Sequence, residues 1–310
     1  MVDAALSAPR DIADARPRSS LRRTMQRKST IAFFMALPLI LLILILVAYP
    51  AGYAVWLSTL NKSMTKFVGL GNFDFLFKRA TFWEVVLQSC LFAITAVIFK
   101  AFIGFVVAHF VNNIPTKGQR KWRGMLLVPW VIPAAMSTLS WLWLFDPSYS
   151  AFNWIFTQLG LGKISWLGEA GWARFSVILV NVWIGAPFFL IMYLAALKSV
   201  PEQLYEAASI DGATWWQRIW YVTLPMMRNI IAITILFSTI VTFANFDIVR
   251  VLTAGGPLTA THVFATWAFK IGIESGDIPL GATVSLFMVP ILAVAATFIL
   301  RDISKRGSEV

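Results

Sequence analysis

Long apolar stretches recur along the chain and are separated by shorter polar segments. Six such windows fall at residues 31–57, 84–110, 124–145, 175–197, 229–249 and 279–300. Residues 31–50 alone carry no charge, and a helix of that length crosses a hydrocarbon core of about 30 Å. Gly and Pro interrupt several windows, but neighbouring helices can satisfy the backbone groups that such breaks free. The pattern predicts an all-α integral membrane protein with six transmembrane helices, whose ends are defined only within a few residues.

The composition supports this prediction. The chain is 58% hydrophobic and 13% charged, whereas soluble domains carry about a quarter charged residues. No cleavable signal peptide is evident, because no small-residue cleavage site follows a short apolar region. The single Cys90 excludes an intrachain disulfide and a multi-cysteine metal site, so no metal site is expected.

The distribution of Lys and Arg predicts the orientation. Seventeen of these residues lie in the N-terminal tail, the second and fourth loops and the C-terminus, and eight lie in the remaining loops. Because cytoplasmic loops collect positive charge, both termini are predicted to be cytoplasmic. Because this topology explains the net charge of +11, no nucleic-acid partner is expected. Residues 1–30 form a basic cytoplasmic tail that anionic lipid would attract, and residues 31–310 form the transmembrane domain.

The fourth loop, residues 199–225, reads as two short helices around a turn. Ser199 with Glu202, and Thr214 with Gln217, each have the spacing of a capping box. Between the two helices, Asp211-Gly212 is a turn signal. Pro225 is expected to open the next span.

Glu206 is the residue of this loop without a local explanation. It shares a helix face with Glu202, and such a pair is repulsive by about 0.2–0.5 kcal/mol. Ala207 and Ala208 beside it would let another surface approach closely. Two interpretations stay open on these facts: a solvated loop, or a docking element for a soluble cytoplasmic partner whose basic residue meets Glu206.

The segment EAASIDGATWWQRIWYVTLP resembles the EAA loop of binding-protein-dependent ABC importers. The positions on the motif are Glu206, Ala207, Ala208, Asp211, Gly212, Ala213, Val222, Leu224 and Pro225. Three further segments, AYPAGYAVWLS, FVGLGNF and VLTAGGP, resemble sugar permeases of the maltose and glycerol-phosphate transporter type. One departure is Ile230, which stands where that family often has Pro.

The resemblance implies a type I ABC importer permease fold with a coupling role for the EAA loop. In the family this loop sits in a cleft of an ATPase subunit, where the Glu pairs with a basic residue and the Gly makes the bend. The chain has no G-x-x-x-x-G-K-[ST] loop to hold ATP phosphates. We therefore expect no catalytic residues and no cofactor here, with ATP and Mg bound by partner subunits.

The expected partners follow from the same resemblance. They are a second, different permease, two copies of a cytoplasmic ATPase subunit, an extracytoplasmic solute-binding protein and membrane lipid. The expected location is the bacterial cytoplasmic (inner) membrane, which the chain crosses several times. The implied solute is a sugar or sugar derivative, and an anionic sugar stays open.

Polar and small residues inside the spans indicate the pathway, because polar groups are costly there. Asn181, Gly185 and Phe188 share one helix face with the neighbouring Ile184, in a stretch resembling the sugar-site segment of maltose-type permeases; helix packing is the alternative.

In the fifth span, Ser238, Thr242 and Asn245 also recur at helical spacing. The first two align with sugar-contacting positions of that family, although Thr242 replaces a familiar Asn. The alternative is that such hydroxyls bond back to their own helix.

Four further charged or titratable residues are left open. Asp247 and Arg250 are close enough to form an ion pair at the outer end of the fifth span, or to meet a polar solute or the binding protein there. Lys100 and His109 lie in the second span and are assigned no ligand. Lys100 is expected to reach toward the interface or a helix-end carbonyl.

Two other classes of membrane protein would carry different sequence features. An ion-coupled secondary transporter would carry inverted repeats and intramembrane carboxylates, and no acidic residue lies deep in a predicted span. A membrane enzyme would carry clustered His, Asp or Cys, whereas this chain has two His and one Cys. The sequence favours the importer permease, with the secondary transporter as the alternative.

Overall fold

The computed structural model describes residues 28–307, and within that range every regular element is a helix. The basic tail predicted over residues 1–30 lies outside the described residues, except for its last three, which begin α2. In chain order the helices and the π-helical turns (η) are α2 (Lys28–Ile43), η1 (Leu44–Ala48), α3 (Tyr49–Ser58), α4 (Gly71–Phe77), α5 (Ala80–Asn112), α6 (Thr116–Leu126), α7 (Val128–Val131), α8 (Ala134–Leu144), α9 (Ala151–Gln158), α10 (Ala170–Ser199), α11 (Glu202–Ile210), α12 (Trp215–Arg218), η2 (Ile219–Thr223), α13 (Leu224–Phe243), α14 (Asp247–Leu252), α15 (Phe264–Phe269), η3 (Lys270–Glu274), α16 (Ile278–Leu286) and α17 (Met288–Gly307).

The chain divides into two units, residues 1–53 and 54–310. In the first unit, α2, η1 and the start of α3 form one continuous helix with exposed apolar side chains, including Phe33, Leu42 and Leu46. A helix that is apolar all round needs lipid or protein around it. The predicted first span is therefore confirmed as a helix.

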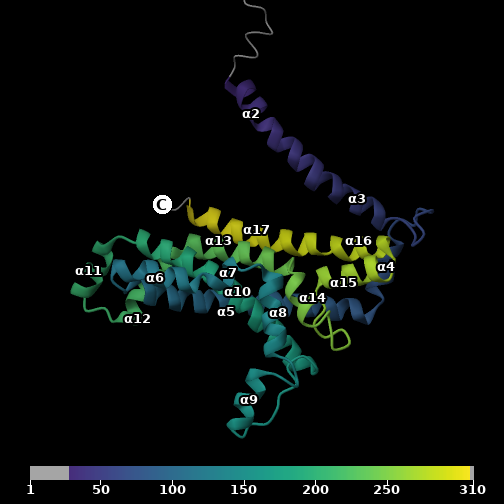
Figure 1. Cartoon of the computed structure of the whole chain (residues 1–310). Helices are drawn as coiled ribbons and strands as arrows, with labels where there is room; N and C mark the ends of the chain where they lie inside the picture. Colours follow the sequence, from purple (N-terminus) through teal and green to yellow (C-terminus); the bar gives the residue numbers. More distant parts are fainter. Residues whose placement is uncertain (1–27, 308–310) are drawn as a thin grey trace, which may run out of the picture. The chain divides into compact units, whose positions relative to one another are not determined.

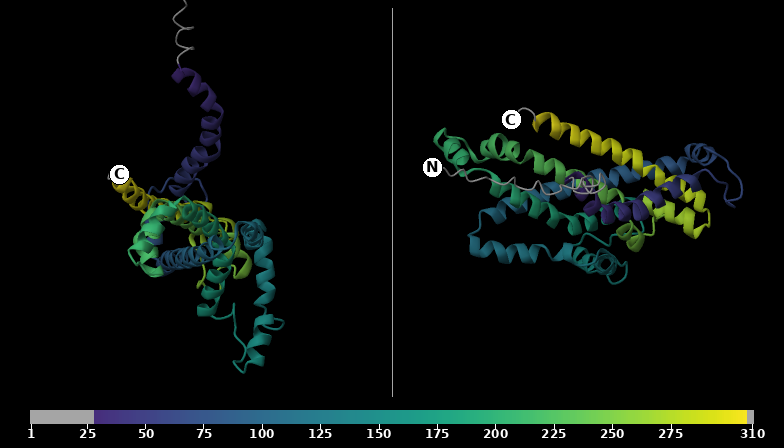
Figure 2. Two further views of the ribbon diagram at one scale, coloured as in Figure 1. Left: turned by 90° about the vertical axis from the view of Figure 1, so that its left-hand side faces the viewer. Right: turned by 90° about the horizontal axis from the view of Figure 1, so that it is seen from above.

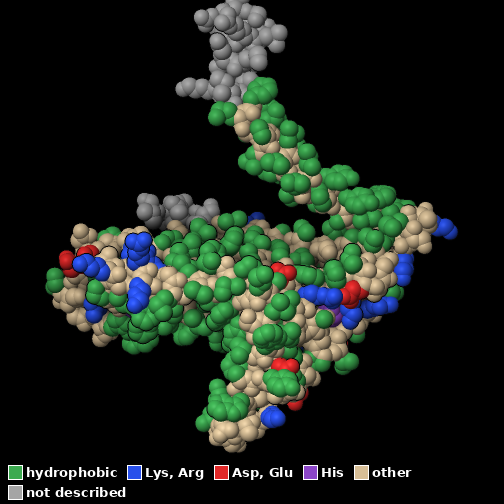
Figure 3. Space-filling view, viewed as in Figure 1, with side chains coloured by type: hydrophobic (Ala, Val, Ile, Leu, Met, Phe, Trp, Pro, Cys, Tyr) green, Lys and Arg blue, Asp and Glu red, His purple; other side chains and the backbone are tan. Residues whose placement is uncertain are grey.

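In the second unit, the long helices α5, α10, α13 and α16–α17 run side by side as a bundle (Figures 1 and 2). The short helices α11 and α12 lie at one end of this bundle, and α4 and α15 lie at the other. Hydrophobic side chains cover the middle of the visible face, and charged side chains gather toward its two ends (Figure 3). This distribution is the one expected for helices that cross a hydrocarbon layer.

Five described helices are long and apolar enough to cross a membrane, and they correspond to five of the six predicted windows. They are residues 32–58, 80–112, 170–199, 215–243 and 278–301. The remaining window, residues 124–145, is divided among α6, α7 and α8 instead of forming one long helix. Ile132 and Pro133 are extended, and they separate α7 from α8. Proline pushes the residue before it out of the helical region and lacks an N–H of its own, so the apolar run is broken there. The count of six spans therefore stays a prediction.

The helix of the fifth window begins earlier and ends earlier than predicted. It runs from Trp215 to Phe243, so Pro225 lies within it rather than at its start. A π-helical turn, η2, precedes the proline; such turns accommodate a break in the i→i−4 hydrogen bonds. Asn245 lies beyond the end of the helix, and it therefore does not share a continuous helix face with Ser238 and Thr242.

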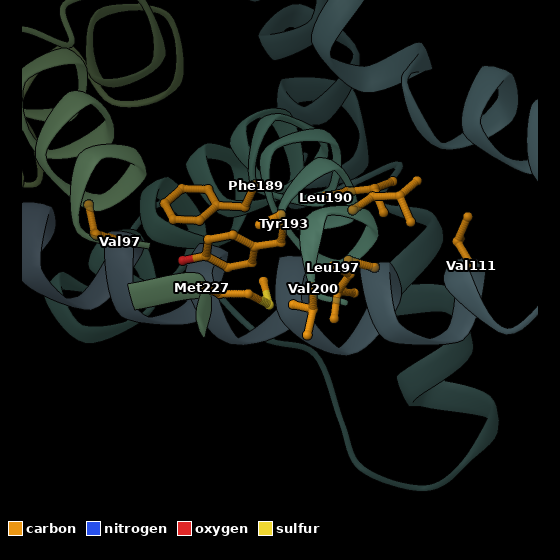
Figure 4. Packing of buried hydrophobic residues seen from close by; sticks show 11 residues of the cluster. Val97, Val111, Phe189, Leu190, Tyr193, Leu197, Val200 and Met227 are labelled. Atoms are coloured by element: carbon orange, nitrogen blue, oxygen red, sulfur yellow. The ribbon is translucent and has the colours of Figure 1, made fainter. Parts of the chain in front are cut away.

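The contact between α5 and α10 forms the centre of the bundle. Val97 and Val111 of α5 pack with Tyr193 of α10 and Met227 of α13 in one buried cluster (Figure 4). Gly104 lets the two helices approach closely, because a Cβ at this position would collide with Phe189. Small residues at helix contacts allow such close packing in membranes.

Candidate functional site

The loop over residues 199–225 stands at one end of the bundle as two short helices, α11 and α12, joined by a tight turn (Figure 1). Gly212 has a φ of 73°, a conformation that costs other residues energy. The N–H of Gly212 donates to the carbonyl of Ser209 at 3.1 Å, and that of Ala213 donates to Ala208 at 2.9 Å. The predicted turn at Asp211-Gly212 is confirmed.

One of the two predicted capping boxes is present. Thr214 accepts from the backbone of Gln217, whose side chain accepts from the backbone of Thr214. The other prediction was wrong: the Ser199 hydroxyl donates to the carbonyl of Ala196 at 2.7 Å, and α11 begins without a side-chain cap after Pro201. Ser199 ends α10, so its hydroxyl turns back onto the preceding helix.

The loop is fastened to the bundle on one side. Tyr205 and Thr223 share a hydrogen bond of 2.9 Å between their hydroxyls. The indole N–H of Trp215 donates to Nε2 of His109, at the end of α5, over 3.1 Å. Arg218 Nη1 donates to the hydroxyl of Ser209 at 3.2 Å. These contacts tie α11 and α12 to each other and to α5.

Glu206 lies on the exposed part of this loop, with Ala207 also exposed and Ala208 half-buried. The ion pairs among the described residues are Lys78–Asp74 and Arg250–Glu274, so the carboxylate of Glu206 pairs with no cation in the part of the chain that the structure describes. The tip of the loop also exposes Ile210, at 86% of its surface.

The pathway candidates of α10 and α13 meet around Lys100. Its Nζ donates to Oγ1 of Thr242 at 2.7 Å, and only 4% of the residue is exposed. A Cβ on Gly185 would lie 2.5 Å from Cδ of Lys100. The expectation that Lys100 reaches toward the interface or a helix-end carbonyl was wrong, because the hydroxyl of Thr242 on a facing helix accepts its hydrogen bond.

Three of the seven pathway candidates, Asn181, Ser238 and Thr242, are buried inside the chain itself. The hydroxyl of Thr242 also donates to the carbonyl of Ser238 at 2.6 Å, which is the back-bonding that the alternative interpretation anticipates. Oδ1 of Asn181 is buried and has no hydrogen-bond partner among the described residues.

The other four candidates are more accessible. Ile184, Gly185 and Phe188 are partly exposed, and the ring of Phe188 packs against Phe237 of α13 at a centroid distance of 5.2 Å. Asn245 is also partly exposed, and its side chain accepts from the backbone N–H of Ile248 at 3.3 Å. That contact satisfies a donor in the first turn of α14.

Arg250 pairs with Glu274 at 2.5 Å, so the predicted ion pair with Asp247 was wrong. Its guanidinium also lies 5.0 Å from the ring centroid of Phe269. Glu274 is 24 residues away in the sequence, in η3, and no short-range spacing indicated it. Asp247 occupies the first turn of α14, where a carboxylate is stabilised by the helix dipole.

Next to this pair lies a buried histidine that the sequence pattern did not reveal. His262 is 1% exposed; its Nδ1 lies 3.1 Å from the hydroxyl of Thr266, and its Nε2 lies 3.3 Å from Nζ of Lys270. Burial lowers the pKa of His262 to about 4, and the positive charge of Lys270 acts in the same direction. The imidazole is therefore neutral at pH 7. It accepts from Lys270 and donates to Thr266.

Comparison with known proteins defines the class of this chain. Residues 100–308 match the family of binding-protein-dependent transport system inner membrane components. The trehalose/maltose transport system permease protein MalF of Thermococcus litoralis is 32% identical over 84% of this chain and 89% of its own. The sulfoquinovosyl glycerol transport system permease protein SmoG of Agrobacterium fabrum is 29% identical over 87% and 89%.

A solved structure of a bacterial alginate ABC transporter, in complex with a periplasmic protein that holds an alginate pentasaccharide, shows the same fold. Its matching chain has a TM-score of 0.78 and 24% identity over 90% of this chain and 95% of its own. The chain belongs to the binding-protein-dependent transport system inner membrane components, as a multi-pass permease of the sugar-transporter type in the bacterial inner membrane. It is a transport component of an ABC importer rather than an enzyme.

Proposed function

We propose that this chain forms half of the pathway of an ABC importer for a sugar or sugar derivative, and that residues 199–225 couple it to a separate ATPase. The observation that carries the proposal is the exposed α11. It presents Glu206, which has no ion pair with any described residue, beside small alanines, while the other side of the loop is bonded to the bundle. Such a surface suits a docking partner with a basic residue.

The roles within the loop follow from this geometry. Glu206 supplies the charge that meets the partner, and Ala207 and Ala208 allow close approach. Asp211, Gly212 and Ala213 form the turn that sets the direction of α12. ATP and Mg are bound by two copies of the ATPase, which supply the energy.

Substitution of Glu206 tests the coupling role. In the reconstituted importer, Glu206→Gln should reduce uptake at least about tenfold, because a charge-assisted contact is lost, while ATP hydrolysis becomes insensitive to solute. Glu202→Gln, one helical turn away and equally exposed, is the matched control and should transport normally. Uptake that survived ATP depletion and followed a proton gradient would refute the importer mechanism.

The remaining parts of the assembly are a second, different permease and an extracytoplasmic solute-binding protein. One bundle leaves the partly exposed Ile184 and Phe188 on its surface, where a facing permease would complete the pathway. Asp247 and Arg250 lie near the end of the bundle opposite the coupling loop, where a binding protein would dock.

The solute class is supported by relatives and by one buried charge. The proteins named above serve trehalose/maltose, sulfoquinovosyl glycerol and alginate, and two of these solutes are acidic. Lys100 has no carboxylate partner among the described residues, and it adds positive potential between α5, α10 and α13. Binding measurements with neutral and acidic sugars on the partner solute-binding protein test this; a preference for amino acids or metal ions would exclude a sugar importer.

A further inference from the structure

Two neighbouring pockets lie where the coupling loop meets the end of α5. The first is an apolar groove of about 550 Å³ whose lining includes Phe102, Phe110, Trp216 and Trp220. The second, of about 230 Å³, is polar, and its lining includes Tyr205 and Arg218. His109, Asn113, Trp215 and Ile219 line both pockets, so the two spaces adjoin each other at these side chains.

Two side chains that line the polar pocket, Arg218 and His109, each carry a buried hydrogen-bond donor without an acceptor among the described residues. Nε of Arg218 has no partner among the described residues, and neither has Nδ1 of His109. Nε2 of His109 accepts from the indole of Trp215, and an indole nitrogen only donates. The neutral ring therefore carries its proton on Nδ1, so both orphaned atoms are N–H donors.

Unsatisfied buried donors are costly, and the cost is greater for a charged group. No carboxylate pairs with Arg218 in the described part of the chain, where its side chain donates to the hydroxyl of Ser209. The pocket consequently calls for an acceptor that carries negative charge, such as a phosphate oxygen.

The depth of the site in the membrane identifies the source of that acceptor. The 33 residues of α5 form a helix of about 50 Å, longer than the hydrocarbon core of about 30 Å. His109 is in its last turn, so it would lie at the level of the headgroups when the excess length is shared between the two ends. Exposed Trp215, Trp216 and Trp220 gather at the same level, as aromatic residues do at membrane interfaces.

We propose that this site binds a phospholipid, with the phosphate on Arg218 and His109 and an acyl chain in the apolar groove. The lipid joins the coupling loop to the end of α5, since both of its anchoring donors come from these two elements. Its binding therefore stiffens the connection between the loop and the bundle. The proposal does not depend on which solute the importer carries.

Lipid binding to the full-length chain tests the proposal. The protein is extracted in mild detergent with the subunits that co-purify, stripped of lipid, and titrated with phosphatidylglycerol by native mass spectrometry and thermal melting. Arg218→Gln should weaken binding at least about tenfold, because a charge-assisted hydrogen bond is lost. Arg120→Gln is the matched control: it removes an exposed charge from α6 at the same end of the bundle.

Two further measurements distinguish binding of the lipid phosphate from binding of the acyl chains or of a free anion. Diacylglycerol with the same acyl chains should bind more weakly than phosphatidylglycerol, and inorganic phosphate alone should neither bind nor compete. Trp220→Ala, at an exposed position outside the hydrogen-bond network, should weaken the lipid and leave folding intact, so the test stands even if Arg218→Gln fails to fold.

Three outcomes would overturn the proposal. Equal lipid binding by Arg218→Gln and Arg120→Gln would mean that water satisfies the two donors. Full competition by inorganic phosphate would mean a free-anion site. Lipid binding only after the partner subunits are removed would mean that another protein chain covers the groove.

Discussion

Lys100 shows how a single charge is accommodated inside a membrane-embedded bundle. The space for its side chain comes from Gly185 on α10, and the acceptor of its hydrogen bond is the hydroxyl of Thr242 on α13. One lysine of α5 therefore joins three helices. The contact with Lys100 explains why a residue without a side chain occupies position 185, and no contact with a solute is needed for this explanation.

Gly185→Ala should destabilise the protein by about 1–3 kcal/mol, because the added methyl overpacks the site against Cδ of Lys100. Thermal melting of the purified protein measures the loss. Gly171→Ala on the same helix is the control, since nothing lies within 4 Å of its added Cβ. If the two variants melt alike, Lys100 moves aside freely and the space at Gly185 is not structural.

One turn and one capping box of the loop over residues 199–225 could be predicted from sequence because their signals are local. The turn at Gly212 and the capping box of Thr214 each depend on residues within a few positions. The partners of Lys100, Arg250 and His109 lie 142, 24 and 106 residues away. A single sequence contains no signal for such distant pairs, because helix packing decides them.

At the scale of elements, the segment between α14 and α15 is held in place by a buried imidazole. The ring of His262 packs against Gly255, where a Cβ would collide with it, and Arg174 of α10 donates to the carbonyl of Ala260 at 3.0 Å. Thr253 and Thr261 join the two ends of the segment through a hydroxyl contact of 2.7 Å.

Acidification should release this segment. The pKa of His262 is about 4 in the fold against 6.5 for the free side chain, so a proton binds the unfolded state more readily. The stability that the neutral ring contributes is complete above about pH 6.5 and is lost as the pH falls toward 4. Melting temperatures between about pH 7.5 and about pH 4.5 measure this slope.

The neighbouring charges and a variant serve as controls for that experiment. Lys270 and Arg250 oppose protonation of His262, and Glu274 favours it. His262→Asn keeps a polar side chain without a proton to gain, so its melting temperature should fall less steeply with acid. If the melting temperature of the variant falls with pH as steeply as that of the wild type, then a group other than His262 is titrating.

The helices could be predicted where a long apolar run is uninterrupted. They could not be predicted where a proline decides whether the helix continues or ends. Five windows became long helices, whereas Pro133 broke the third window, residues 124–145, and Pro225 was accommodated in a helix after a π-helical turn. The two prolines look alike in sequence. Their outcome differs because the preceding residue is extended before Pro133 and helical before Pro225.

For the whole molecule, the orientation predicted from Lys and Arg has a direct test. Ile210 at the tip of the coupling loop and Leu258 between α14 and α15 are 86% and 94% exposed, and they belong to opposite ends of the bundle. In a Cys90→Ser background, a membrane-impermeant thiol reagent should label Leu258→Cys in spheroplasts. It should label Ile210→Cys only in inverted vesicles. Labelling of Ile210→Cys from outside would reverse the orientation.

The close contact of Gly104 with Phe189 has a mechanical consequence. Two helices in backbone-level contact resist sliding past each other, so we expect α5 and α10 to turn together as one rod. The coupling loop is bonded to one end of that rod through Trp215 and His109. Over about 50 Å, a tilt of roughly 5° at the loop displaces the opposite end by about 4 Å, which is on the scale of the helix shifts that switch transport and signalling proteins.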